Sequence, residues 1–104
     1  MIKFQIWYMR PEFFQDGIVG MLPDPDDLPT THIHLKDLDL EDGAQLERVY
    51  NHMQAEVWSP NGEARELIAS KGLMHTSMAV GDVIVDQQGG VFAVAGIGFT
   101  ELAR

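Results

Sequence analysis

Three side chains with the chemistry of a hydrolase, His75, Ser77 and Asp82, lie within one short stretch of the sequence. In an extended chain, side chains two positions apart share a side, so His75 and Ser77 are neighbours. A Ser-His-Asp hydrolase also needs the imidazole between hydroxyl and carboxylate, and an oxyanion hole. No Gly-x-Ser-x-Gly sequence is present, and Ser77 does not follow a strand into a helix. We therefore expect the hydroxyls of Thr76 and Ser77 to bond backbone groups and hold the following turn.

A His-x-His pair, His32 and His34, offers a second kind of chemistry. On a strand both imidazoles point the same way, which is a geometry found in metal sites, and His75 could supply a third ligand. A solvent-facing strand also needs polar residues at alternate positions, and histidine fills that role without a metal. We favour this second interpretation and expect no cofactor. A metal site at these three histidines stays as the alternative.

The residues that follow His75 predict a turn and two strands. Gly81 can adopt positive φ, and Asp82 can bond nearby backbone, so the pair suits a tight turn. The β-branched run 83–85 reads as a buried strand. The polar and glycine-rich residues 86–90 then separate it from a second apolar run, 91–95, as a hairpin loop does.

This C-terminal third resembles the YodL-like domain family. The resemblance rests on residues 75–84 (HTSMAVGDVI), a glycine-rich spacer, residues 91–94 and the pair Gly98-Phe99. The family has a similar serine-containing element that ends in Gly-Asp-Val or Ser-Asp-Val, then a strand pair and a terminal Gly-Phe. Its motif positions here are His75, Thr76, Ser77, Gly81 and Asp82. Ala79 stands where the family prefers a second serine. The resemblance implies a small protein carried on plasmids, phages or integrative elements.

The rest of the chain predicts strands and helices in turn. Residues 2–9 and 31–36 alternate in polarity as strands do. Residues 39–55 predict one main helix, because an apolar stripe recurs at helical spacing; it is Leu46, Val49, Tyr50 and Met53. A short strand is expected at 57–58 and a second helix at 63–71, ended by Gly72. The proline-rich residues 23–29 predict a stiff, extended loop.

These elements together predict an α+β fold. We expect a mostly antiparallel sheet of four to five strands, with the main helix and the short second helix on one face. The first strand is apolar on both faces, so it should be an interior strand. A chain of 104 residues is the size of one domain, and we expect residues 1–104 to form it.

The composition narrows the classes of function. The net charge is −9, which argues against direct binding to nucleic acid and for either plain solubility or a basic protein partner. The candidate partner-binding residues are Asp24, Asp26, Asp27, Asp37, Asp39 and Asp42.

We expect no membrane segment, no secretory signal and, with no cysteine, a cytoplasmic protein. The predicted function is a small acidic binding or accessory protein without enzymatic activity, acting on a basic or nucleic-acid-binding host protein. The alternative is a small metal-dependent or hydrolytic enzyme that uses His32, His34 and His75.

Overall fold

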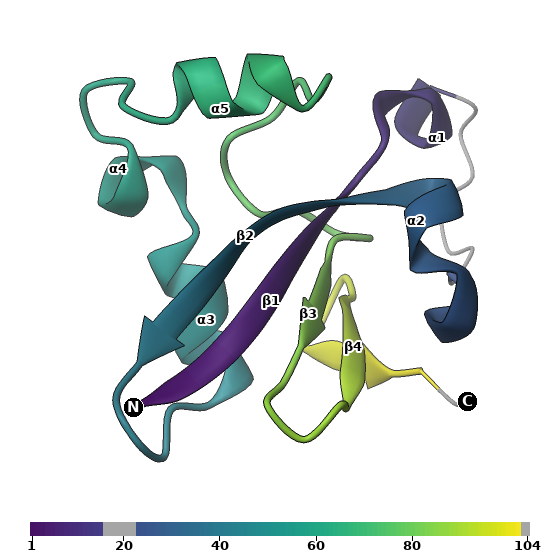
Figure 1. The fold of residues 1–104 in the computed structure, drawn as a ribbon, viewed down its shortest axis with the longest axis vertical. Coiled ribbons are helices and arrows are strands. Elements are labelled where there is room, and N and C mark those ends of the chain that lie inside the picture. The colour runs from purple at the N-terminus through teal and green to yellow at the C-terminus, as the bar shows by residue number, and fades with distance from the viewer. Residues whose placement is uncertain (16–22, 103–104) are drawn as a thin grey trace.

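Strand β1 (Ile2–Met9) is the interior strand on which the fold is built. In the structure, a computed structural model that describes residues 1–15 and 23–102, β1 pairs on one side with β2 (His32–Leu40) and on the other with β3 (Val83–Val85). Strands β4 (Val91–Val94) and β5 (Phe99–Glu101) complete a sheet of order β2-β1-β3-β4-β5, in which every pair is antiparallel (Figure 1). The predicted α+β fold and the interior position of β1 are confirmed.

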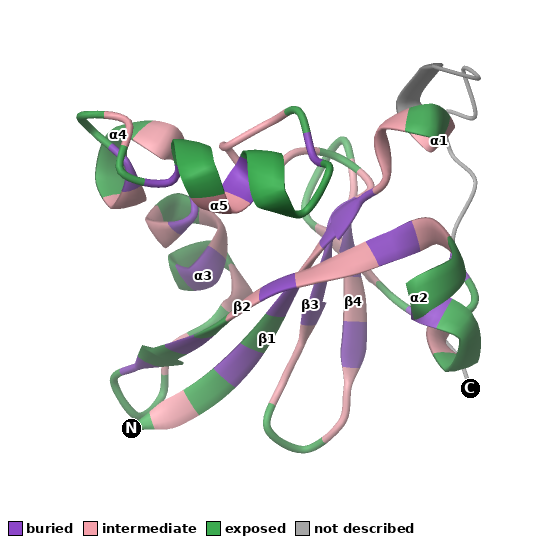
Figure 2. Cartoon of the chain, turned by 45° about the horizontal axis from the view of Figure 1, so that its top comes forward, coloured by how far each residue is buried: buried purple, intermediate pink, exposed green. Residues whose placement is uncertain are grey.

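The alternation along β1 divides the sheet into two faces. Phe4, Ile6 and Tyr8 belong to the main apolar cluster, whereas Trp7 packs against a second cluster on the opposite face. Figure 2 shows this alternation as buried and more exposed bands along the strand. The second cluster is smaller, and its buried members are Leu28, Val83, Val91, Ala93 and Leu102.

Strand β2 keeps its apolar residues on the core face by means of a bulge. Trp7 pairs with His34 but Ile6 pairs with Lys36, so Leu35 is an extra residue in β2. The extra residue reverses which positions face the core, because side chains alternate with period two. Leu35, on one side of this irregularity, and Leu38, on the other, are therefore both buried.

Three short helices cover the core face: α3 (Leu46–His52), α4 (Ala55–Trp58) and α5 (Arg65–Ser70). They follow one another across the left and top of the view in Figure 1. The predicted apolar stripe is confirmed, because Val49 and Met53 are fully buried in the main cluster and Leu46 and Tyr50 pack against it.

Two predictions about this region are wrong. The single helix expected over 39–55 is replaced by the end of β2, a turn, α3 and α4. Leu38 and Leu40 alternate with Asp37 and Asp39, and pairing with β1 draws this segment into the sheet. The strand expected at 57–58 is helical, within α4. The second helix is confirmed as α5, although it begins at Arg65.

The proline-rich segment is also more helical than expected. After α1 (Pro11–Gln15), residues 25–31 form the 3₁₀ turn η1 (Pro25–Asp27) and the short helix α2 (Leu28–Thr31). Pro25 and Pro29 lie at the starts of these turns, where the fixed φ of proline suits a helix. The extended loop was therefore the wrong expectation. Leu28 packs into the second apolar cluster and anchors this segment to the sheet.

The C-terminal hairpin forms where the sequence predicts it. Residues 86–90 join β3 to β4, and Asp86 Oδ1 accepts the backbone N–H groups of Gln88 (3.0 Å) and Gly90 (2.7 Å). The chain then returns as β5, which the sequence did not predict as a separate strand. No helix within residues 1–15 and 23–102 has the length and apolar character required to cross a membrane.

Candidate functional site

The carboxyl group of Asp82 is the centre of a buried polar network. The residue is fully buried, and three N–H groups converge on it. Oδ1 accepts the backbone N–H of Met9 at 2.8 Å, and Oδ2 lies 2.8 Å from both the backbone N of Ala79 and Nε2 of His75. Burying a carboxyl group costs free energy unless its oxygens are hydrogen-bonded, and here both oxygens are.

The end of strand β3 explains why Asp82 lies there. β3 begins at Val83, which pairs with Trp7, so no strand residue lies opposite Met9 on this side. Gly81, at φ 97°, donates its N–H to the carbonyl of Val94 in β4, and the carbonyl of Asp82 accepts the N–H of Val94, so Gly81 and Asp82 form a bulge opposite this residue. The side chain of Asp82 then accepts the N–H that a continued β3 would have accepted. The Gly-Asp turn predicted from the sequence is therefore present, and its aspartate reaches across to β1.

Tyr8 and Trp58 complete the network through one backbone oxygen. The carbonyl of Thr76 accepts the hydroxyl of Tyr8 at 2.7 Å and Nε1–H of Trp58 at 3.1 Å. The ring of Tyr8 stacks on His75, with centroids 4.5 Å apart. Burial, and then the charge of Asp82, raise the pKa of the Tyr8 hydroxyl, which therefore stays protonated as a donor. We call this set, Tyr8, Met9, Trp58, His75, Thr76, Ala79 and Asp82, the Asp82 network.

The structure brings together two members of the candidate triad and directs the third elsewhere. Asp82 holds His75 by Nε2, which is the orienting contact of a hydrolase. The hydroxyl of Ser77 accepts the backbone N–H of Ala55 at 2.9 Å, at the first residue of α4. Since this N–H has no partner within its own helix, Ser77 caps α4 from a segment 22 residues away.

The two histidines of the His-x-His pair have different surroundings. His32 is fully buried, with Nδ1 2.7 Å from the Thr31 hydroxyl and Nε2 2.7 Å from the carbonyl of Gly81. A carbonyl only accepts, so Nε2 carries the proton and Nδ1 accepts from Thr31. Burial lowers the pKa of His32 and favours this neutral form. His34 is partly exposed; it bonds Asp37 at 2.8 Å and stacks on Trp7 at 5.1 Å.

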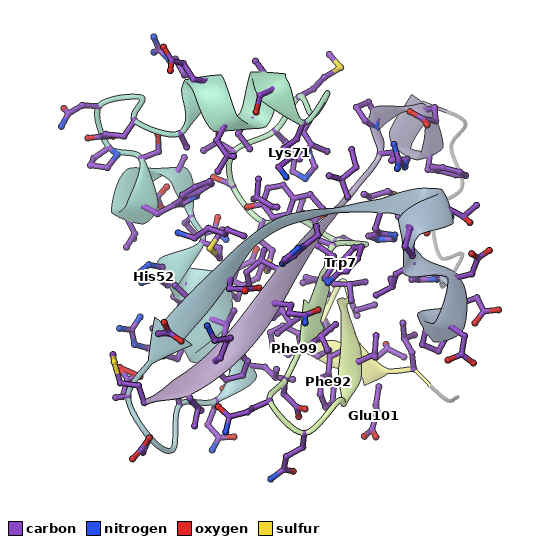
Figure 3. The ribbon with its side chains drawn as sticks, in the orientation of Figure 1. Trp7, His52, Lys71, Phe92, Phe99 and Glu101 are labelled. Atoms are coloured by element: carbon purple, nitrogen blue, oxygen red, sulfur yellow. The ribbon has the colours of Figure 1, made fainter. Side chains whose placement is uncertain are left out.

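These surroundings do not assemble a metal site from the described residues. Within residues 1–15 and 23–102, no three His, Cys, Asp or Glu side chains are placed to hold a metal ion. Both ring nitrogens of His32 are engaged with protein atoms. A further histidine, His52, lies on α3 at the left of Figure 3, away from Trp7 near the middle of the view.

The six candidate aspartates form two groups. Asp24, Asp26 and Asp27 lie in and before η1, where Asp24 Oδ1 accepts the N–H of Asp26 at 2.9 Å. Asp37, Asp39 and Asp42 lie on the second half of β2 and just beyond it. Since β2 runs from α2 at the right of Figure 1 to its arrowhead at the lower left, the two groups lie near opposite ends of this strand.

Each aspartate of the second group has a basic neighbour. Asp37 pairs with His34, Asp39 lies 3.8 Å from the ammonium group of Lys3, and Asp42 lies 3.0 Å from the N-terminal amine. These pairs are exposed, so they contribute little to stability and can exchange partners readily. An incoming basic group could therefore replace one of these basic neighbours at a small cost in free energy.

The sequence interpretation missed Trp7 as a surface residue. Trp7 is half-buried, donates Nε1–H to Gln5 at 3.1 Å and stacks on His34, all on the face opposite α3, α4 and α5. The strict alternation of β1 was the available signal, because it places Trp7 opposite the face of Ile6 and Tyr8.

Comparisons of the chain with protein-family models, with curated proteins and with solved structures find no match.

Proposed function

We propose that the protein is a small binding or accessory protein without enzymatic activity, which acts in the cytoplasm on a protein partner that carries a basic surface. The observation that carries this proposal is the placement of Asp37 and Asp39. They are exposed, two positions apart on one face of an edge strand of the sheet, and each pairs with a basic side chain at the surface. A net charge of −9 adds long-range attraction for a basic partner.

The nature of the partner follows from the same charge. Direct binding to a phosphate backbone requires clustered lysine and arginine, and this chain has 7 basic against 16 acidic residues. A protein that itself binds nucleic acid offers the complementary basic surface. The resemblance to YodL-like domains supports an origin on a mobile element, and such a small acidic protein would occupy the nucleic-acid-binding site of a host factor.

A second candidate function, hydrolysis, is favoured by one observation. The contact between His75 and Asp82 is the orienting half of a Ser-His-Asp site. Against it stands the hydroxyl of Ser77, which caps α4. A fluorophosphonate probe separates the two, because it labels an activated serine and ignores a capping one. Zinc titration followed by thermal unfolding tests the metal-dependent version, since a metal that binds only the folded state raises Tm.

The test of the main proposal begins with affinity capture of partners from the native host. The association rate of each captured protein is then measured at two ionic strengths with three forms of this chain. They are the wild type, a double variant with Asp26→Lys and Asp27→Lys, and a double variant with Asp37→Lys and Asp39→Lys. We expect a rate that falls steeply with salt, because exposed charges are screened beyond about 8–10 Å. We also expect the charge reversals to lower it. A rate that is insensitive to salt and equal in all three proteins would contradict the proposal.

A further inference from the structure

Strand β2 presents an open row of backbone hydrogen-bonding groups. Two contacts fix their direction: Arg10 N–H donates toward β2, to the carbonyl of Thr31, whereas Met9 N–H donates toward β3, to Asp82. Even-numbered residues of β1 therefore bond β2, and odd-numbered residues bond β3, because the direction alternates along an antiparallel strand.

The register carries this alternation onto β2. Phe4 pairs with Leu38 and Ile2 with Leu40, so the N–H and C=O groups of Leu38 and Leu40 point toward β1. The same groups of Asp37 and Asp39 then point outward, away from the sheet. Within the described residues, no hydrogen bond to these outward groups is present, and both residues are exposed.

We propose that an extended basic segment of the partner adds to this edge as a sixth strand. This inference rests on the proposed function and deepens it by naming the mode of binding. Residues of the segment that lie directly opposite Asp37 and Asp39 would exchange both backbone hydrogen bonds with them. Their side chains would share the face of the two aspartates, at cross-strand distances where lysine or arginine pairs with a carboxylate.

The core face of β2 determines which residues the bound segment carries between its basic ones. Leu38 and Leu40 are buried on the core face, and the ammonium group of Lys36 lies over the ring of Trp58 there, 5.1 Å from its centroid. Segment residues between the basic ones would lie beside these groups, where an apolar or β-branched side chain fits and a second cation beside Lys36 does not. The strand recognised therefore alternates basic and apolar residues.

A second copy of this chain fits the edge poorly. Pairing β2 with another β2 brings the aspartates of one strand against those of the other, and like charges across strands are destabilising. Each copy also carries a net charge of −9. The open edge is thus protected from self-association by the same charges that attract a basic segment.

The test uses three synthetic nine-residue peptides in which lysine alternates with valine. The first peptide is unmodified. The second is N-methylated at the backbone amides of its lysines, which would face β2. The third is N-methylated at the backbone amides of its valines, which would face solvent. All three carry the same charge. We expect the first and third to bind alike by fluorescence anisotropy at low salt, and the second to bind at least about tenfold more weakly, because it lacks the donors to β2.

The protein variants locate the site. Asp37→Asn with Asp39→Asn should weaken binding of the unmodified peptide, whereas Asp26→Asn with Asp27→Asn, at the other end of β2, should change it much less. The outward amides of Asp37 and Asp39 should gain protection from hydrogen exchange when the peptide is bound, while that of Leu38, already bonded to β1, should change little.

The outcomes separate the two levels of the proposal. Equal, salt-dependent binding of all three peptides overturns strand addition and leaves a basic partner held by charge alone. If none of the peptides binds but the captured partner associates in a salt-dependent way, strand addition is again overturned and the proposed function stands. If neither the peptides nor any captured protein shows salt-dependent association, both proposals fail. Association of the protein with itself that Asp37→Asn with Asp39→Asn strengthens would assign the edge to a second copy.

Discussion

The Asp82 network and the outer edge of β2 lie on either side of β1. The polar groups of the first are buried and bonded within the fold, whereas those of the second are exposed at the surface. In the network, the buried carboxyl group receives three N–H donors, and each polar atom contacts another part of the fold. At the edge, exposed aspartates pair with basic side chains at the surface, and the outward backbone groups of Asp37 and Asp39 have no hydrogen-bond partner among the described residues. The residues that most resemble a catalytic site thus bond other parts of the fold, and the proposed partner site consists of residues that resemble ordinary surface.

The largest expected effect is that of Asp82→Ala. It leaves the N–H groups of Met9 and Ala79 without an acceptor inside the protein, and we expect a loss of about 3–5 kcal/mol in the free energy of unfolding. Urea denaturation measures it. If the variant does not fold, Asp82→Asn, which keeps one acceptor oxygen, should still lose about 1–3 kcal/mol. Asp39→Ala is the matched exposed control, and its free energy of unfolding should stay within about 0.5 kcal/mol of the wild type. Equal losses for the Asp82 and Asp39 variants would contradict the difference between the buried network and the exposed edge.

The apolar support of the network comes next. Met53 is fully buried under the sheet, and its backbone carbonyl accepts the N–H of Met78 at 3.1 Å. Met53→Ala should cost about 2–5 kcal/mol, since it leaves a cavity in the main cluster. Leu46 is half-buried at the start of α3, the helix that ends just before Met53, and Leu46→Ala should cost about 1 kcal/mol. A larger midpoint shift for Leu46 than for Met53 in urea denaturation would contradict the packing described for α3.

Ser77→Ala sharpens the distinction between a structural and a catalytic serine. Removing the hydroxyl leaves the first N–H of α4 without its acceptor, and we expect a loss of about 1–2 kcal/mol. Ser70→Ala, at the exposed end of α5, should change stability by less than about 0.5 kcal/mol. The wild type should show no labelling by a fluorophosphonate probe. Labelling that disappears in Ser77→Ala would instead assign a nucleophile.

The smallest effect is a pH dependence that arises from His32. Its folded pKa lies below the ordinary value, because burial and Arg10 disfavour the charged ring more than Asp82 and the Gly81 carbonyl favour it. The unfolded chain therefore takes up the proton first, and stability should fall as pH drops below about 6.5, by at most about 1.4 kcal/mol per pH unit.

Urea midpoints at a series of pH values test this dependence. His32→Gln should flatten it. His52 shifts in the same direction, so His52→Gln should remove a part of the slope. An identical slope in the wild type and in His32→Gln would show that the buried imidazole does not contribute.

The fold class could be predicted because local periodicity reports it. The alternation of residues 2–9 and the stripe from Leu46 to Met53 each depend only on neighbouring residues. The extent of β2 could not be predicted from the sequence. Asp39 precedes a helical stripe and therefore resembles the start of a helix, and only its pairing with β1 shows that it belongs to a strand. The role of Asp82 was equally hidden, because its acceptor contact to Met9 joins residues 73 positions apart. The pairing of Ser77 with α4 has the same origin: the sequence shows a hydroxyl and does not show which N–H it meets.

The pairing of β1 with β3 has a consequence for synthesis on the ribosome. Gln5 pairs with Val85, 80 positions later, so β1 can form a ladder with β2 long before its second neighbour exists. Closing so long a loop is slow, and until it closes one side of an apolar strand stays unpaired. A nascent chain that ends before residue 83 should therefore be prone to aggregate and to recruit chaperones. The segment from residue 83 onward is therefore the one that completes the pairing of β1.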